Sequence, residues 1–186
     1  MSRYIRPAIP GATIFFTVAL AERGSRLLVD EIDLLRRAYG ATLRDRPLRT
    51  DAIVVLPDHL HCVWTLPEGD ADYATRWRLI KARVSRALPM PPRRASQSAR
   101  RERGLWQRRY LEDHIRDEAA LHTAIARCHR DPVKHGLTDD PFGWPHSSIH
   151  RDMAAALRHG AAIRAREPWQ PPAHAPVTLP TAAPLG

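Results

Sequence analysis

Two histidines, His59 and His61, stand one residue apart in the segment 51–67, DAIVVLPDHLHCVWTLP. This segment is typical of two strands joined at Pro57-Asp58, with both histidines early in the second strand. Because side chains alternate along a strand, both imidazoles would project from one face, roughly 7 Å apart. Two imidazoles that lean across this gap can share one metal ion, whereas a structural role in the core is the alternative. The opposite face would carry Leu60, Cys62, Trp64 and Leu66.

The chain has 186 residues, enough for one domain with a sizeable core. Its formal charge is +9, and lysine occurs only at Lys81 and Lys134, so the excess comes from arginine. The planar guanidinium suits bidentate phosphate contacts and stacks on bases. We therefore expect a nucleic-acid partner. A GC-rich genome also enriches arginine over lysine, so a basic protein without such a partner is the alternative.

The candidate DNA contacts are basic side chains in an N-terminal arm (1–10), in a predicted helix (72–88) and in a loop rich in proline, serine and arginine (89–104). The charges on the helix are also compatible with an ordinary solvated face. The candidates are Arg3, Arg6, Arg76, Arg78, Lys81, Arg83, Arg93, Arg94, Arg100, Arg101 and, further along the chain, Lys134.

The two cysteines, Cys62 and Cys128, lack CxxC spacing and lie among apolar neighbours, which favours buried free thiols. No apolar run approaches the length of about 18 residues that a membrane span needs. The apolar run Thr13–Leu20 is followed by Ala-Glu-Arg rather than by a cleavage site of a signal peptide. We expect a cytoplasmic protein without a membrane partner.

Hydrophobic periodicity predicts strands over 13–20, 48–56, 59–66 and 106–111, and helices over 25–39, 72–88 and 117–130. Gly40 is expected to end the first helix, and Asp131-Pro132 the third. This order indicates an α+β fold, a ferredoxin-like two-layer sandwich with a central antiparallel sheet. The domain would span 1–152, followed by a weak helix (153–167) and a disordered proline-rich tail (168–186).

Several blocks in the same order are similar to one known family. They are Gly11–Val18, Val54–Asp70, Arg76–Lys81, Trp106–Arg116, Asp131–Gly136, Trp144–Ser148 and His150–Asp152. In this arrangement the chain resembles the REP-associated tyrosine transposases, which belong to the single-tyrosine HUH superfamily of insertion-sequence transposases. The resemblance runs from about Tyr4 to Asp152.

The resemblance implies the HUH fold and a divalent-metal site, for Mg²⁺ or Mn²⁺, held by His59, His61 and a polar residue on a later helix, here Asp131. In the family the metal polarises the scissile phosphate, and a tyrosine one helical turn before the third ligand attacks it to form a 5′-phosphotyrosine link. The implied substrate is single-stranded or hairpin DNA of the REP type, which is cleaved and rejoined in transposition. No protein partner is implied.

The sequence departs from the family pattern at the nucleophile. Arg127 stands one turn before Asp131, and no tyrosine lies within 117–130. Arginine stays protonated at physiological pH and cannot attack, but it can bind a phosphate. Tyr110 is the nearest tyrosine and a candidate substitute nucleophile, and His129 is a further one.

Three functions are therefore compatible with the sequence. The first is an active transposase with a substitute nucleophile, and the second a catalytically inactive regulator that binds hairpin DNA. The third is a metal-dependent hydrolase in which water replaces the tyrosine. The missing tyrosine favours impaired catalysis.

Overall fold

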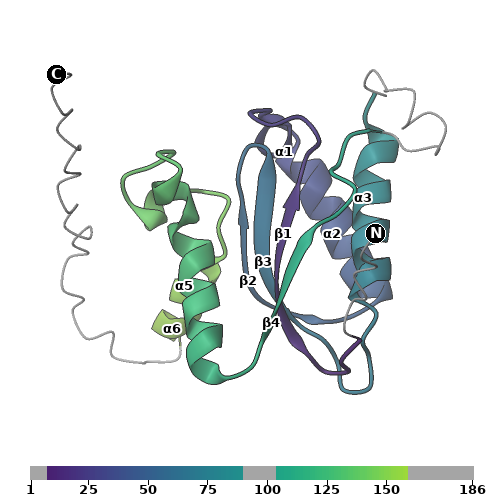
Figure 1. Cartoon of the computed structure of the whole chain (residues 1–186). Coiled ribbons are helices and arrows are strands. Elements are labelled where there is room, and N and C mark those ends of the chain that lie inside the picture. Colours follow the sequence, from purple (N-terminus) through teal and green to yellow (C-terminus); the bar gives the residue numbers. More distant parts are fainter. Residues whose placement is uncertain (1–7, 90–103, 159–186) are drawn as a thin grey trace, which may run out of the picture.

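A four-stranded antiparallel sheet in the order β2-β3-β1-β4 forms the centre of the protein. The computed structural model describes residues 8–89 and 104–158. Figure 1 shows α2 and α3 on one face of the sheet and α5 and α6 on the other. The connectivity βαββαβ confirms the predicted ferredoxin-like α+β fold. The elements are β1 (Thr13–Ala19), α1 (Leu27–Asp30), α2 (Ile32–Asp45), β2 (Arg49–Val55), β3 (His59–Thr65), α3 (Tyr73–Ala87), β4 (Leu111–Ile115), α5 (Glu118–Lys134), η1 (Pro141–Gly143) and α6 (Ile149–Arg158).

Some predictions fall outside the described residues. They concern most of the N-terminal arm and of the arginine-rich loop, the end of the last helix and the proline-rich tail. The candidate DNA contacts Arg3, Arg6, Arg93, Arg94, Arg100 and Arg101 belong to these segments. Within 8–89 and 104–158, no helix is both long and apolar enough to cross a membrane.

The two faces of the sheet belong to two separate apolar clusters. On the α2–α3 face, Trp64 of β3 stacks on Trp77 of α3 with ring centroids 4.3 Å apart. On the α5 face, Phe15 and Val63 pack with Cys128 of α5. The alternation expected for 59–66 is therefore correct, and both histidines lie on the α5 side. Cys62 and Cys128 are buried free thiols, as predicted.

The first predicted helix is wrong in both its continuity and its end. The helix is interrupted at Glu31, which separates α1 from α2. Gly40 lies inside α2 rather than after it. Glycine in a helix costs about 1 kcal/mol relative to alanine. Burial of Leu35 and Ala38 against the sheet offsets this cost. The periodicity of the sequence does not reveal how large this stabilisation is.

The last strand was also misplaced. The predicted strand 106–111 shares only Leu111 with the observed strand, and Trp106 forms only an isolated bridge to Leu20. The strand is β4, with the polar sequence LEDHI; among the described strands it pairs only with β1, at the border of the sheet. The opposite border, β2, is covered by residues 146–148: the Val55 N–H donates to the His146 carbonyl at 2.9 Å, and the Ser148 N–H to that of Ile53 at 2.8 Å.

The helix α5 passes through Asp131-Pro132, where the sequence predicted its end, and continues to Lys134. Proline lacks an N–H group and normally interrupts a helix. Here Pro132 is buried, and beyond it the His135 N–H still donates to the Asp131 carbonyl at 3.0 Å. The extra turn keeps Asp131 and His135 on one helix face. The following helix, α6, begins at Ile149, before the predicted position 153.

Arg76 is a structural residue rather than a DNA contact, which corrects the sequence-based prediction. Its side chain is 2% exposed, and it donates to the carbonyls of Arg46, Pro47 and Asp72 and to the Asp70 carboxylate at 2.7–3.0 Å. This network ties α3 to the end of α2, and the hydrogen bond from Arg76 to the Asp70 carboxylate lowers the pKa of Asp70.

Replacement of Arg76 by methionine should destabilise the fold by about 3 kcal/mol, because it leaves buried carbonyls and one carboxylate without their donor. Urea unfolding followed by circular dichroism measures the change. Arg78→Ala, which removes an exposed charge two residues later, is the control and should leave the free energy of unfolding within about 0.5 kcal/mol of the native value. Equal stability of the two variants would contradict the structural role of Arg76.

Candidate metal centre

Three histidines and one carboxylate meet between β3 and the end of α5. The Oδ2 atom of Asp131 lies 3.0 Å from Nε2 of His61, 3.4 Å from Nε2 of His135 and 3.6 Å from Nε2 of His59. His59, His61 and Asp131 are each 5% exposed or less, whereas His135 opens to solvent. The structure therefore brings together the three residues that the sequence singled out.

The two strand histidines are oriented by neighbours on the sheet. Nδ1 of His59 lies 2.6 Å from Oδ1 of Asp58, and Nδ1 of His61 lies 2.8 Å from Oγ1 of Thr17 on β1. Partners of this kind fix the orientation of an imidazole and direct its other nitrogen at a metal. Asp58 is held in turn by the Gly24 N–H at 2.8 Å and by Arg23 at 3.3 Å.

The Asp131 carboxylate supplies the test of whether a metal fits. Its Oδ2 atom is buried, and none of the three nearby nitrogens meets hydrogen-bond geometry. A buried carboxylate oxygen without a donor is costly unless a cation neutralises it. Ligand atoms of His59, Asp131 and His135 lie within 4.8 Å of one another. These residues fit a divalent metal ion.

The electrostatics of the site are dominated by these mutual contacts. Burial raises the pKa of Asp131, but the neighbouring His59 and His61 outweigh this effect and hold the pKa well below its usual range. For His59 the effect of burial is to lower the pKa. Asp131 and Asp58 raise it by more than burial lowers it, so the pKa of His59 is raised overall. The carboxylate is thus ionised at neutral pH and available to a cation.

Sequence reasoning missed His135 as a member of the cluster. The signal was present as an Asp-x-x-x-His spacing, which places both side chains on one helix face. It was overlooked because Pro132 was expected to end the helix. The centroids of the His59 and His135 rings lie 5.0 Å apart. The end of α5 therefore contributes both Asp131 and His135 to the cluster.

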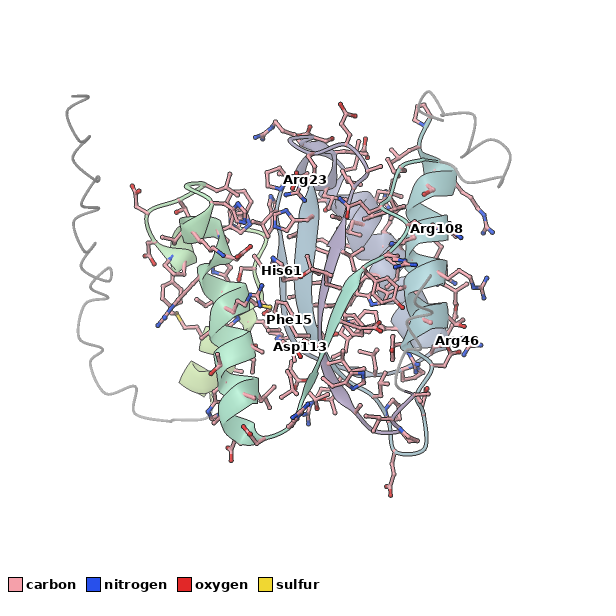
Figure 2. All side chains as sticks on the ribbon, viewed as in Figure 1. Phe15, Arg23, Arg46, His61, Arg108 and Asp113 are labelled. Carbon is pink, nitrogen blue, oxygen red and sulfur yellow. The ribbon has the colours of Figure 1, made fainter. Side chains whose placement is uncertain are left out.

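Arg127 lies on α5 one turn before Asp131, at the position where the family tyrosine was expected. Its guanidinium carbon lies 4.7 Å above the ring of Phe15, which stacks on His61 at 5.3 Å. Figure 2 shows Phe15 and His61 in the space between the sheet and α5. An exposed cation therefore borders the cluster.

Tyr110 is not brought to the histidines. It packs against Phe16 and Trp77 in the cluster on the α2–α3 face of the sheet. His129 is also turned away, since its Nε2 lies 3.3 Å from the Ser148 hydroxyl and 3.4 Å from the Asp152 carboxylate.

The candidate DNA contacts within the described residues differ in their surroundings. Arg83 pairs with Thr42 and Asp45 on α2, and Lys81 donates to the Gln107 carbonyl at 3.0 Å. Arg78 and Lys134 are exposed.

Comparison with known proteins gives close relatives. The chain is 41% identical, over 84% of its length and 88% of the relative, to a REP-associated tyrosine transposase of Escherichia coli K12. It is 40% identical, over 84% of its length and 90% of the relative, to a Haemophilus influenzae protein assigned to the same family. No family model matches.

A solved structure extends this similarity to the fold. A REP-associated tyrosine transposase bound to a REP hairpin superimposes with a TM-score of 0.73 at 41% sequence identity, covering 84% of this chain and 88% of that one. The βαββαβ sheet and its His-x-His strand define the class, that of the HUH-type transposases. Within it, this chain belongs to the REP-associated tyrosine transposase family.

Proposed function

We propose that this protein binds single-stranded or hairpin DNA of the REP type at a metal-associated phosphate site, without forming the covalent tyrosyl link. The observation that carries the proposal is Arg127, a permanent cation one turn before Asp131. Support for the ligand comes from the similar transposase whose structure holds a REP hairpin.

The described part of the chain offers no tyrosine beside Asp131. Tyr39 lies in the opposite cluster, where it contacts Thr50 and Trp64, and burial raises its pKa. Tyr73 and Tyr110 belong to the same cluster. Burial also raises the pKa of the Cys128 thiol to about 12, so this thiol stays protonated and is a poor nucleophile. Tyr4 lies outside the described residues and is included in the test below.

Arg127 gives the site a binding role in place of attack. A guanidinium donates two parallel hydrogen bonds to a phosphate, and stacking on Phe15 limits its freedom before the ligand arrives. Because Phe15 also stacks on His61, the cation is positioned relative to the metal ligands. A phosphate could then contact the guanidinium and the ion together.

We further propose that His59, His61, Asp131 and His135 hold the divalent ion, and that it is Mn²⁺ rather than Mg²⁺. Imidazole nitrogens suit Mn²⁺ better than Mg²⁺, which prefers oxygen ligands and retained waters. When bound, the ion polarises a phosphate oxygen and neutralises part of its charge. Thr17 and Asp58 are positioning residues for the two strand histidines.

Calorimetric titration with MnCl₂ tests the ligand set. Asp131→Ala and His61→Ala should abolish measurable binding, whereas Thr17→Val, which removes only an orienting hydroxyl, should weaken it about tenfold. MgCl₂ should displace Mn²⁺ only in large excess. His122→Ala, a change on the exposed face of the same helix, is the control and should bind as the native protein does. Unchanged affinity in Asp131→Ala would contradict the ligand assignment.

A labelled hairpin with a single-stranded flank, incubated with Mn²⁺ and resolved under denaturing conditions, tests the missing nucleophile. The native chain should bind the hairpin yet form no covalent adduct. Arg127→Tyr should form one, because the hydroxyl would stand one turn before Asp131. Arg127→Phe supplies the same ring without the hydroxyl and should form none.

Other outcomes of this assay distinguish the alternatives. An adduct with the native chain that disappears in Tyr4→Phe or Tyr110→Phe would identify a substitute nucleophile and overturn the proposal. Nicked DNA without an adduct would show that water attacks instead. Failure of the native chain to bind any hairpin would remove the DNA-binding role itself.

A further inference from the structure

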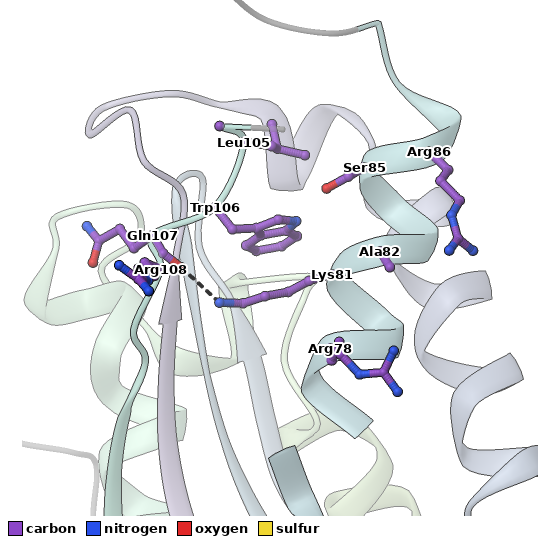
Figure 3. Close-up of a pocket in the computed structure, with 10 residues that line it drawn as sticks. Arg78, Lys81, Ala82, Ser85, Arg86, Leu105, Trp106, Gln107 and Arg108 are labelled. Atoms are coloured by element: carbon purple, nitrogen blue, oxygen red, sulfur yellow. Dashed lines mark hydrogen bonds between the residues drawn. The ribbon is translucent and has the colours of Figure 1, made fainter. Parts of the chain in front are cut away.

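A second cationic site lies on the other face of the sheet, between α3 and the segment Gly104–Arg108 that leads to β4. The cavity there has a volume of about 400 Å³. This is within the range of pockets that hold small ligands and is sufficient for one nucleotide. Figure 3 shows the Trp106 ring between Lys81 and Ser85, with Arg78 and Arg86 further along the same helix. The metal-ligand cluster is on the α5 side, so the two sites cannot bind the same phosphate.

The charges of α3 are divided between two helix faces. Arg76 and Arg83 face α2 and the start of α3, where carboxylates and carbonyls neutralise them. Arg78, Lys81 and Arg86, at spacings of three and five, line the cavity together with Arg108. Among the lining residues that fall within 8–89 and 104–158, none carries a carboxylate. Several cations gathered at one cavity favour an anionic ligand.

Two of these cations are available for a ligand. Arg78 and Arg86 are exposed and, in the described part of the chain, have no carboxylate or carbonyl partner. Lys81 is instead held in place: its ammonium donates to the Gln107 carbonyl at 3.0 Å and lies 5.8 Å from the centre of the Trp106 ring. An ammonium held in place, together with two exposed guanidinium groups on the same helix, is a suitable receptor for a phosphate with its flanking sugar.

Trp106 adds a feature that a simple charged surface lacks. Its indole N–H is buried and has no acceptor in the described residues. A buried donor without an acceptor is unfavourable, and a ligand oxygen in the cavity would satisfy it. The indole is also a surface on which a base can stack.

The register of β4 connects this cavity with the metal-ligand cluster. Tyr110 lies on the α3 side, with its ring 5.5 Å from the Lys81 ammonium. The next residue, Leu111, is 73% exposed and pairs with Thr17, which contacts His61. A chain of nucleotides could therefore pass across the border of the sheet at Leu111, from one site to the other.

We propose that this cavity, lined by Arg78, Lys81, Arg86, Trp106 and Arg108, binds one nucleotide of the single strand that adjoins the DNA hairpin. The proposal rests on the proposed function, since it assigns a second contact to the same DNA. In this arrangement the cationic side chains contact the phosphate of the nucleotide, and its base stacks on the Trp106 ring.

The test compares a blunt hairpin with the same hairpin carrying a single-stranded extension. Arg78→Ala/Arg86→Ala should weaken binding of the extended hairpin about tenfold and leave the blunt hairpin unaffected. Each phosphate contact on a single strand contributes about 0.7 to the slope of log affinity against log salt, so the slope should fall by about 1.4. Trp106→Leu should weaken the extended hairpin by a similar factor at an unchanged slope.

Arg37→Ala/Arg44→Ala is the matched control, because it removes the same charge from exposed positions of α2. Equal affinity of the two double variants for the extended hairpin would overturn the assignment of a nucleotide to this cavity. If both variants still bind the hairpin, the proposed function is unaffected. If neither hairpin binds the native chain, the proposed function itself fails.

A photoreactive thymidine analogue in the extension provides an independent readout. Crosslinks should fall within residues 104–110, and crosslinks confined to α5 or β3 would contradict the assignment. Titration with a free deoxynucleoside monophosphate separates the two sources of a nucleotide. Tight binding of the free nucleotide, lost in Arg78→Ala/Arg86→Ala without any change for extended DNA, would overturn the assignment to a DNA strand.

Discussion

The buried carboxylate of Asp131 is the constraint on which the arrangement of this protein depends. It stands beside three imidazoles contributed by two elements that are distant in sequence. To reach them, α5 must lie flat on the open face of the sheet, and it must continue through Pro132. The cluster of Phe15, Val63 and Cys128 beneath the helix sets that distance. Packing and electrostatics thus specify the same position for one helix.

Much of this site could be predicted from the sequence, because it depends on local periodicity. The alternation around His59 and His61 fixed their common face, and the histidines do lie opposite a helix. The contribution of His135 could not be predicted in the same way, because it requires a helix to continue past a proline. Burial of Pro132 decides this, and burial is a property of the tertiary structure.

The basic residues show more clearly that surroundings set by the tertiary structure cannot be predicted from local sequence. Composition indicates a polyanionic partner but does not separate a cation that meets DNA from one that ties helices together. Arg76 and Arg78 are two residues apart on one helix, yet one is enclosed by carbonyls and the other is exposed. Their different surroundings are set by α2, which is far away in the sequence. The polar strand β4 was missed for a related reason, since its pairing with β1 is a long-range property.

The two borders of the sheet have a consequence for the behaviour of the protein in concentrated solution. Unpaired strand borders invite pairing with other molecules and are a common origin of aggregation. Residues 146–148 cover β2 and occupy backbone groups of Ile53 and Val55, so few are left there to pair with a strand of another molecule. The strand β4 has five residues and carries Glu112, Asp113 and His114, which makes it short and charged. Both features discourage the sheet from growing by the addition of a strand from another molecule.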